Sequence, residues 1–360
     1  MLVLPGKGTV VTQLGSSFAL FNCDDQSLYE IDGPAAWVWR QVSSHDTGMK
    51  RSHLSARLSS EFSLTIAHAE TLLDRYIELG ILHACTVSAS AFAIRLNDTR
   101  WLIESPAELS EELKGLCRGI LAPIELRRSH RHIVVGTNSH RYELIADDKC
   151  LGAFNYSEIV PAIKSFLTDA LLQTDFTLAL HAALLRRGDM QLLIAGASGA
   201  GKTTLALALA AERRWSMHGD DIVMVDERSG LRGVPFPIAV KDGSWTLLRN
   251  LWPQLASGRV NIRSDGKIVK FLPCEADRDD SSTPCSTTMI FIRRTIAGRR
   301  SLSRVSPLTA FQRLLSEAAS PTQKLTDRAF GSLAELVNRA QAFEMDVGKL
   351  EDAVQAIGSL

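Results

Sequence analysis

Residues 192–209 read LLIAGASGAGKTTLALAL and contain the pattern that decides the fold of the surrounding region. An apolar run typical of a β-strand leads into a glycine-rich turn, and a helix rich in alanine and leucine follows. The spacing from Gly196 to Gly201, Lys202 and Thr203 fits G-x-x-x-x-G-K-[ST], the pattern of a phosphate-binding loop. Because the strand and the helix that this motif requires are both present, the sequence predicts a polyphosphate site here.

Each part of this loop has a chemical reason. Its glycines allow backbone angles that other residues avoid, so successive N–H groups can turn towards a polyphosphate. The helix that follows adds the positive end of its dipole at the same place. We expect Lys202 to reach the β- and γ-phosphates of ATP and Thr203 to ligate Mg²⁺. The predicted nucleotide-binding residues are Gly196, Ala197, Ser198, Gly199, Ala200, Gly201, Lys202, Thr203 and Thr204.

The composition indicates a folded chain with more than one domain. It has 360 residues, 45% of them hydrophobic and 22% charged, which is too long for a single core and too apolar for disorder. Lys and Arg number 40 and so do Asp and Glu, so the net charge favours neither nucleic acid nor an anionic membrane as a partner. The first residues lack a signal-peptide pattern, and no apolar run is long enough to cross a bilayer. We therefore expect a cytoplasmic protein.

The first eighty residues predict a small winged-helix-like module of three strands followed by three helices. Turn signals separate the strands, and the spacing of Ala35, Val38, Trp39 and Val42 predicts one apolar helix face. Gly33-Pro34 is a typical helix start, and a glycine ends the third helix. The predicted strands are residues 9–14, 18–21 and 27–31, and the predicted helices begin at residue 33 and span residues 53–62 and 67–79.

This segment resembles the PqqD family, the peptide-chaperone or leader-recognition domains found in clusters that modify ribosomally made peptides. The resemblance rests on the Asp24-Asp25 turn, the strand at residues 29–31, GPAAWVW at 33–39 and LLDRYIELGIL at 72–82. It implies a peptide-binding domain over residues 1–86, in which a leader peptide adds as a strand beside the third strand and lies against the third helix. Half of the groove residues are expected to lie in the core. The groove residues it implies are Leu28, Tyr29, Glu30, Leu73, Arg75, Tyr76 and Ile77.

Residues 87–170 predict a β-rich region that links this module to the next domain and packs on it. Four strand-like runs and one polar helix occur here, and no pattern in them indicates chemistry. His130 and His132 lie among arginines and are interpreted as part of a solvated basic face. The predicted strands are residues 92–96, 99–103, 133–135 and 141–145, and the predicted helix is 108–116.

From residue 171 to residue 360, the order of helix, strand, glycine-rich loop, helix and strand is that of an α/β P-loop domain. Asp220-Asp221 follows the loop, and His181 precedes it. A serine hydroxyl is a poor nucleophile, so one carboxylate can accept its proton while the other holds Mg²⁺ opposite Thr203. We assign Asp220 as the base and Asp221 as the metal ligand, with the reverse left open. His181 is a further candidate, as a functional or a core histidine.

This constellation resembles HPr kinase/phosphorylase and its relatives, in which an upstream His, the loop and an acidic pair recur in this order. The stretch VPFPIAVKDGSW at 234–245 resembles a segment of HPr-kinase-related peptide kinases. The resemblance implies a kinase core that uses ATP and Mg²⁺. The Glu-x-Arg-Gly-x-Gly signature tied to the reverse phosphorolysis does not occur after Asp221, so that activity is not implied.

Together, the two resemblances imply a multidomain α/β serine kinase of the lasso-peptide type, acting on a Ser or Thr hydroxyl of a ribosomally made precursor peptide. The leader peptide is the expected partner; other peptide-maturation enzymes and a second copy of the chain are left open. Two alternatives remain, a nucleotide-gated peptide chaperone without phosphoryl transfer and a regulatory kinase of a folded HPr-like protein. Asp220-Asp221 favours transfer, because a chaperone needs no base.

Overall fold

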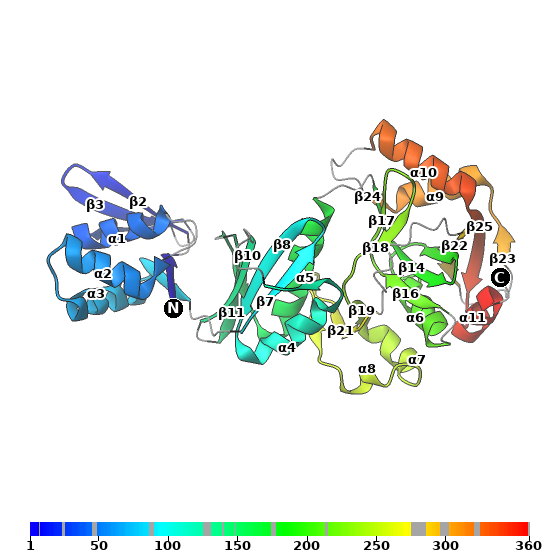
Figure 1. The fold of residues 1–360 in the computed structure, drawn as a ribbon, viewed down its shortest axis with the longest axis horizontal. Helices are drawn as coiled ribbons and strands as arrows, with labels where there is room; N and C mark the ends of the chain where they lie inside the picture. Colours follow the sequence, from blue (N-terminus) through cyan, green and yellow to red (C-terminus); the bar gives the residue numbers. More distant parts are fainter. Residues whose placement is uncertain are drawn as a thin grey trace. The chain divides into compact units, whose positions relative to one another are not determined.

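The computed structural model in Figure 1 contains both helices and sheets. It describes residues 1–6, 8–23, 26–44, 49–85, 90–124, 131–138, 140–147, 149–173, 178–212, 215–274, 286–295, 302–319 and 325–358. In this part of the chain there are eleven α-helices and six sheets, which confirms the mixed α/β class. The chain divides into two compact units: Met1–Glu112 with Ala122–Ile159, and Leu113–Leu121 with Val160–Leu360. The Asp24-Asp25 turn and His130 lie outside the described residues.

The N-terminal part of the first unit contains all three predicted strands and all three predicted helices. Strands β2, β3 and β4 form an antiparallel meander in which β3 is central. The first and third helices begin at side-chain caps: Asp32 accepts a hydrogen bond from the Ala35 N–H, and Thr65 accepts one from the His68 N–H. The elements are β2 Thr9–Leu14, β3 Ser17–Asn22, β4 Ser27–Ile31, α1 Gly33–Ser43, α2 Arg51–Glu61 and α3 Ile66–Glu78.

A second small sheet in this region was not predicted. Strand β1 (Leu2–Pro5) lies between β5 (Met49–Lys50) and β6 (Leu82–Cys85). These strands are too short to show an alternating pattern, so sequence reasoning passed over them. Below them, apolar residues of the helices and of β3 form one core, which includes Leu20, Val38, Leu54, Leu58, Leu73 and Tyr76.

The rest of the first unit is built around a six-stranded sheet of order β12-β11-β10-β8-β7-β9. All four strands predicted in this region occur, and so does the polar helix α4; β9, β12 and the long helix α5 were not predicted. His132 is exposed on β10. The elements of this region are β7 Ser90–Leu96, β8 Thr99–Ser105, α4 Ala107–Leu116, β9 Leu121–Ala122, β10 Arg131–Asn138, β11 Arg141–Ala146, β12 Lys149–Phe154 and the start of α5 Tyr156–Leu172; residues 113–121 and the part of α5 from Val160 on belong to the second unit.

The second unit has a central sheet of order β16-β14-β15-β22-β25-β23. Strands β15, β22 and β25 are parallel, whereas β14 is antiparallel to both β15 and β16. The carboxyl ends of β15, β16 and β22 therefore meet the start of β14 at one edge. These strands are β14 Ala182–Arg187, β15 Met190–Ala195, β16 Ser216–Gly219, β22 Ser286–Arg294, β23 Leu302–Arg304 and β25 Gln341–Val347.

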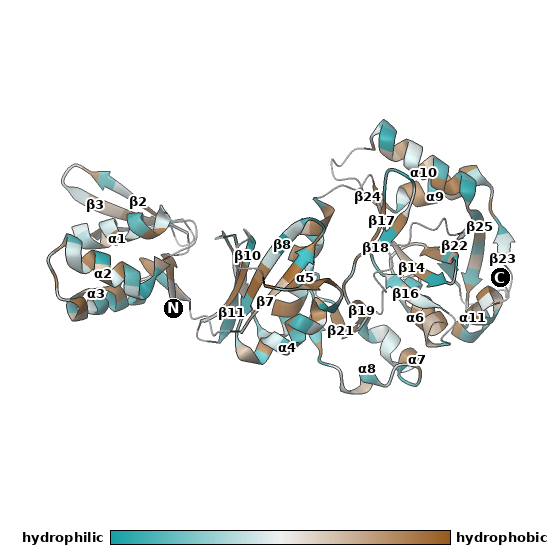
Figure 2. Ribbon diagram, in the orientation of Figure 1, coloured by the Kyte–Doolittle hydropathy of each residue, from teal (hydrophilic) through white to brown (hydrophobic). Residues whose placement is uncertain are grey.

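Alternate residues of these strands bury opposite faces of the sheet. Leu192 and Ile194 of β15 join a core with α6 (Lys202–Ala211) and α11 (Leu350–Gly358). Leu193 and Ala195 join a different core that contains residues of α9 and α10. In Figure 2, α3 and α10 carry both brown and teal bands, as amphipathic helices do. This second core also includes residues of β13 Leu178–Leu180, β17 Val223–Val225, β18 Leu231–Gly233, α9 Pro307–Ser316 and α10 Asp327–Arg339.

A small antiparallel sheet of order β19-β21-β20 completes the second unit. It contributes Ile238, Val240 and Leu272 to the core around α6. Among the described residues, no helix combines the length and the apolar character needed to cross a bilayer. The remaining elements are β19 Ile238–Lys241, α7 Trp245–Leu248, α8 Gln254–Ser257, β20 Asn261–Ile262, β21 Ile268–Leu272 and β24 Ala318–Ala319.

Candidate functional site

The candidate site lies at the carboxyl-terminal ends of β15, β16 and β22 in the central sheet, a place called the strand edge below. The glycine-rich loop (residues 196–201) connects β15 to α6, and Asp220 and Asp221 follow β16 directly. His181 comes immediately before β14, whose first residue, Ala182, pairs with Ala195 at the end of β15. The topology thus brings together three motifs that are dispersed along the sequence.

The loop depends on glycine at two positions in particular. Gly196 has φ of +150°, and a Cβ there would lie 2.5 Å from the carbonyl oxygen of Ile292 on the neighbouring strand. Gly201 has φ of +100° and is the residue that precedes the first turn of α6. Only glycine allows both the close approach to β22 and the left-handed turn into the helix. The strand–loop–helix geometry that the motif requires is therefore present.

Lys202, the first residue of α6, is buried and folds back over the loop. Its ammonium donates hydrogen bonds to the carbonyl oxygens of Gly196 and, at 3.3 Å, Ala197. Burial lowers the pKa of Lys202, while nearby carboxylates, Glu317 first, oppose this effect by favouring the ammonium. The positive charge is thus held at the loop, where a polyphosphate would be cradled.

Thr203 and Asp220 join the helix to the acidic pair. The Thr203 hydroxyl donates to Asp220, with Oγ1 at 3.1 Å from Oδ1 and 2.9 Å from Oδ2. Asp220 is buried, and burial, reinforced by the negative charge of Asp221, raises its pKa to about 6. A cation beside these oxygens would relieve this electrostatic cost. The neighbouring Thr204 is turned into the protein, where its Oγ1 lies 2.7 Å from Ser244 Oγ.

Asp221 lies in a different environment from its neighbour. Its backbone is left-handed, with φ of +70°, and its side chain is 37% exposed. The Arg263 Nη1 donates to Oδ2 at 3.1 Å, and His181 Nε2 lies 3.5 Å from Oδ1. His181, and then the charges of Lys164 and Arg263, hold the pKa of this carboxyl well below its usual value. Asp221 is therefore an ionised, accessible carboxylate at neutral pH.

His181, which sequence analysis left as either functional or core, contacts two carboxylates. Its Nε2 faces Asp221, and its Nδ1 lies 3.2 Å from Glu317 Oε2. Glu317 is 136 positions further along the chain. No motif marks Glu317, and only the pairing of β24 with β13 brings it here.

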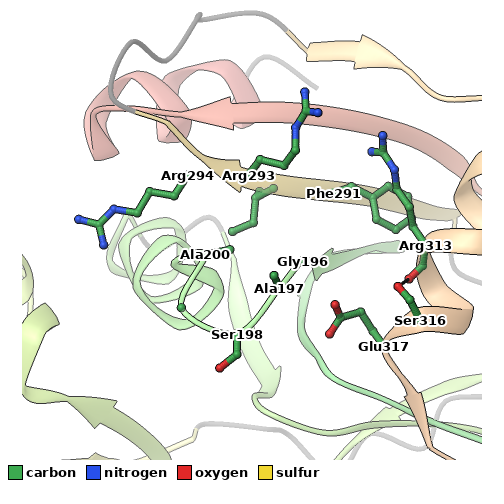
Figure 3. Close-up of a pocket in the computed structure, with 12 residues that line it drawn as sticks. Gly196, Ala197, Ser198, Ala200, Phe291, Arg293, Arg294, Arg313, Ser316 and Glu317 are labelled. Carbon is green, nitrogen blue, oxygen red and sulfur yellow. Dashed lines mark hydrogen bonds between the residues drawn. The ribbon is translucent and has the colours of Figure 1, made fainter.

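A cavity of about 440 Å³ opens beside the loop. Figure 3 shows that Glu317 reaches it from the end of α9, while Arg293 and Arg294 extend from the end of β22. Two of its arginines are paired: Arg293 with Asp346 at 3.1 Å, and Arg313 with Glu344 at 2.7 Å. The cavity is lined by residues 196–200, Phe291, Ile292, Arg293, Arg294, Arg313, Ser316 and Glu317.

Sequence reasoning missed three charged residues of this region: Glu317, Arg263 and Lys164. Arg263 lies between β20 and β21, neither of which was predicted. Lys164 lies on α5, in a region where no chemistry was predicted, and its charge acts on both carboxyls of the acidic pair. Each belongs to an element that reaches the site through tertiary packing, so no local signal was available.

The residues predicted to line a peptide groove fall into two groups. Leu28 and Tyr29 are 66% and 52% exposed on β4, and Glu30 and Arg75 are exposed as well. Leu73 and Tyr76 are instead buried in the module's core, and the Tyr76 hydroxyl donates to Asp32 at 3.1 Å. Ile77 is partly buried. Leu73 and Tyr76 therefore offer a peptide no accessible surface in this structure.

The described residues contain no group of three or more His, Cys, Asp and Glu side chains placed to hold a metal ion. Mg²⁺ does not need one, because it is commonly held by one or two protein oxygens together with substrate phosphates and water. Thr203 Oγ1 and the Asp220 carboxylate are oxygens of this kind, and they lie next to the loop. The donor set present fits Mg²⁺ bound together with a nucleotide.

Comparison with known proteins adds no family to this picture. No family model matches the chain, and no curated protein gives a significant match.

Proposed function

We propose that this protein is an ATP- and Mg²⁺-dependent kinase that phosphorylates a Ser or Thr hydroxyl of a peptide. One observation carries the proposal: the Thr203 hydroxyl, at the end of the glycine-rich loop, is hydrogen-bonded to Asp220, and the accessible carboxylate of Asp221 follows directly. A phosphate loop needs only one such acid to complete its metal site. A second, ionised carboxylate at the same edge is what an acceptor hydroxyl requires.

The geometry favours the reverse of the assignment made first from the sequence. Asp220 contacts Thr203, so we place Asp220 on the metal side and Asp221 on the acceptor side. The raised pKa of Asp220 by itself suits a base. Positive charge beside a carboxylate favours its ionised form, however, so a cation held by Thr203 and Asp220 would cancel that rise. Contact geometry therefore outweighs the pKa in this assignment.

In the proposed reaction, the acceptor hydroxyl attacks the γ-phosphorus of ATP. The bond to the bridging oxygen of ADP breaks, and the hydroxyl proton passes to Asp221. Lys202 and the loop N–H groups stabilise the phosphate oxygens. Mg²⁺ held by Thr203 and Asp220 would neutralise charge on the phosphates. Because the transition state is loose, Asp221 mainly needs to orient the hydroxyl, so its low pKa is no obstacle.

The first unit supplies a surface that suits a peptide substrate. In the meander, β4 is an edge strand that pairs with β3, and Leu28 and Tyr29 are exposed on it. An extended peptide can add to such an edge through backbone hydrogen bonds. The resemblance of this module to PqqD-type domains makes a leader peptide the proposed ligand. Tethering the leader would raise the local concentration of the acceptor to roughly millimolar.

The test is direct. The purified chain is incubated with Mg-ATP and the precursor peptide encoded beside its gene, and the peptide is analysed by mass spectrometry. The proposal predicts addition of phosphate to Ser or Thr, lost in Asp221→Asn. A peptide that binds and changes the ATPase rate without gaining phosphate would instead support the nucleotide-gated chaperone. Transfer to a folded HPr-like protein, but not to the peptide, would support the regulatory kinase.

A further inference from the structure

The main chain of Glu317 is hydrogen-bonded to the main chain of His181. It follows the last residue of α9, and the next two residues form β24, which pairs with β13 just before His181. The His181 N–H donates to the carbonyl oxygen of Glu317 at 2.9 Å. Strand pairing thus places the two residues side by side, so their side chains meet without depending on a mobile loop.

The side chains of Glu317 and His181 are also in contact, and the His181 ring reaches Asp221 of the acidic pair. Glu317 Oε2 lies 3.2 Å from His181 Nδ1, and the other ring nitrogen faces Asp221 Oδ1 at 3.5 Å. The Glu317 side chain is 20% exposed, so water screens the contact only in part. A ring held at Nδ1 has little freedom to rotate, and this fixes the direction of Nε2.

A negative charge at the position of Glu317 does not stabilise its own helix. It caps the carboxyl end of α9, where the helix dipole disfavours negative charge. It also lines the cavity beside the loop, and it is the strongest of the charges that favour the Lys202 ammonium. Glu317 therefore contributes to the lining beside the phosphate loop and, through the His181 ring, is linked to Asp221.

We propose that Glu317 is a positioning residue of the phosphoryl-transfer site: it holds the His181 ring so that Nε2 faces Asp221, and thereby orients the carboxylate that receives the acceptor proton. This inference rests on the proposed kinase function. The Asp221 side chain is 37% exposed; Arg263 holds its Oδ2 at 3.1 Å, and the His181 ring is the group that faces its Oδ1. Glu317 acts on Asp221 only through the His181 ring.

The positioning role is tested with Glu317→Ala, Glu317→Gln, His181→Ala and the double Ala variant, assayed with Mg-ATP and the precursor peptide. Glu317→Ala should lower kcat about 10–100-fold, the range typical of residues that orient a working side chain, with KM for ATP unchanged. Glu317→Gln should recover most of the activity, because an amide can hydrogen-bond to Nδ1 in either tautomer: its oxygen accepts from an Nδ1–H and its NH₂ donates to an unprotonated Nδ1. Adding Glu317→Ala to His181→Ala should cause no further loss.

Glu344→Gln is the matched control, since Glu344 pairs with Arg313 near the same cavity. It should leave kcat unchanged. A Glu317→Ala enzyme with normal kcat, a loss that adds fully to that of His181→Ala, or an equal loss in Glu344→Gln would overturn the positioning role.

A measurement without turnover separates this inference from the proposed function. In ¹⁵N-labelled protein, the ring-nitrogen signals of His181 are compared between wild type and Glu317→Ala. The inference predicts a shift at Nδ1 and a broadened Nε2 signal, and unchanged ring signals would refute it. If the ring signals shift but the wild type transfers no phosphate to any peptide, the contact stands and the kinase function fails.

Discussion

The site at the strand edge of the second unit and the exposed edge of β4 in the first unit were both suggested by sequence, and they differ in how they are built. At the strand edge, backbone topology determines which residues meet: Lys202, Thr203 and Asp220 converge because β15 and β16, which flank β14, end at the same edge of the sheet. At β4, the elements also occur as predicted, but side-chain exposure divides the expected groove residues, with Leu28 outside and Leu73 inside.

Sequence motifs therefore predict some kinds of site more precisely than others. A motif whose spacing is set by backbone geometry, such as the loop with Gly196 and Gly201, predicts positions residue by residue. A surface carried over from a helix face predicts the element and not the exposure of each side chain, because a packed core uses the same apolar residues as a binding groove. The largest functional effects should therefore come from the strand edge.

Lys202→Ala should have the largest effect. It removes the charge that meets the transferring phosphate, so phosphoryl transfer should fall at least about 10³-fold. Peptide binding to the first unit should survive, as measured by fluorescence anisotropy with a labelled leader peptide. Lys267→Ala, which alters an exposed lysine paired with Asp265 at 2.8 Å, is the control and should transfer normally. Wild-type turnover of Lys202→Ala would mean that the loop is not the phosphate site.

Substitution of Asp221 and of Asp220 should have different kinetic effects. Asp221→Asn should lower kcat by roughly 10²–10⁴-fold with little change in Mg²⁺ dependence, because the proton acceptor is lost. Asp220→Asn should instead raise the Mg²⁺ concentration needed for half-maximal rate. Mg²⁺ titrations of both variants measure this. Identical titration curves would contradict the division of roles between the metal side and the acceptor side.

Buried Asp220 in the second unit and the Arg51 ion pairs in the first unit should make folding stability depend on pH with opposite sign. Burial raises the pKa of Asp220 to about 6, so the metal-free fold is most stable where this group is protonated, and stability falls as pH rises from about 4 to 6. Asp220→Asn should therefore raise Tm at pH 7.5 in EDTA by more than it does at pH 4. Equal Tm changes at both pH values would show that the buried carboxyl carries no such cost.

In the first unit, Arg51 contacts both Glu70 and Asp74, and it helps to lower the pKa of each carboxyl. Stability from this cluster is present at neutral pH and is lost as pH falls through the lowered pKa values. Arg51→Gln should cost at most about 1 kcal/mol at pH 7, because Asp74 is exposed and Glu70 partly so, and less at low pH, where the hydrogen bond of Arg51 to the Glu70 carbonyl oxygen is the contact that remains. Urea unfolding at both pH values measures the cost; an equal cost at both pH values would exclude the ion pairs as its source.

The smallest effect on turnover should come from the β4 edge. Leu28→Ala should weaken leader binding by about 1 kcal/mol and raise KM for the peptide while kcat stays constant. Leu14→Ala, on the other edge strand of the meander and 60% exposed, is the matched control. If Leu14→Ala weakens binding as much as Leu28→Ala, the peptide does not select the β4 edge.

Sequence reasoning reached the loop, the acidic pair and most long elements, because each carries a local signal of spacing or periodicity. It did not reach Glu317, Arg263 or Lys164, whose roles arise from tertiary contacts across distant parts of the chain. It also left the roles of Asp220 and Asp221 open, since adjacent residues at a strand end can point in different directions. The Thr203–Asp220 hydrogen bond supplies the information that spacing lacks.

The proposed reaction is transfer of the γ-phosphoryl group of ATP to a peptide hydroxyl at the strand edge. It is measured in a rapid-quench single turnover with γ-³²P-labelled ATP, excess enzyme and the precursor peptide. Label should appear on the peptide at the rate at which ATP is consumed, and Asp221→Asn should slow both together. ATP consumption with the label released only as inorganic phosphate, in the presence of bound peptide, would contradict it.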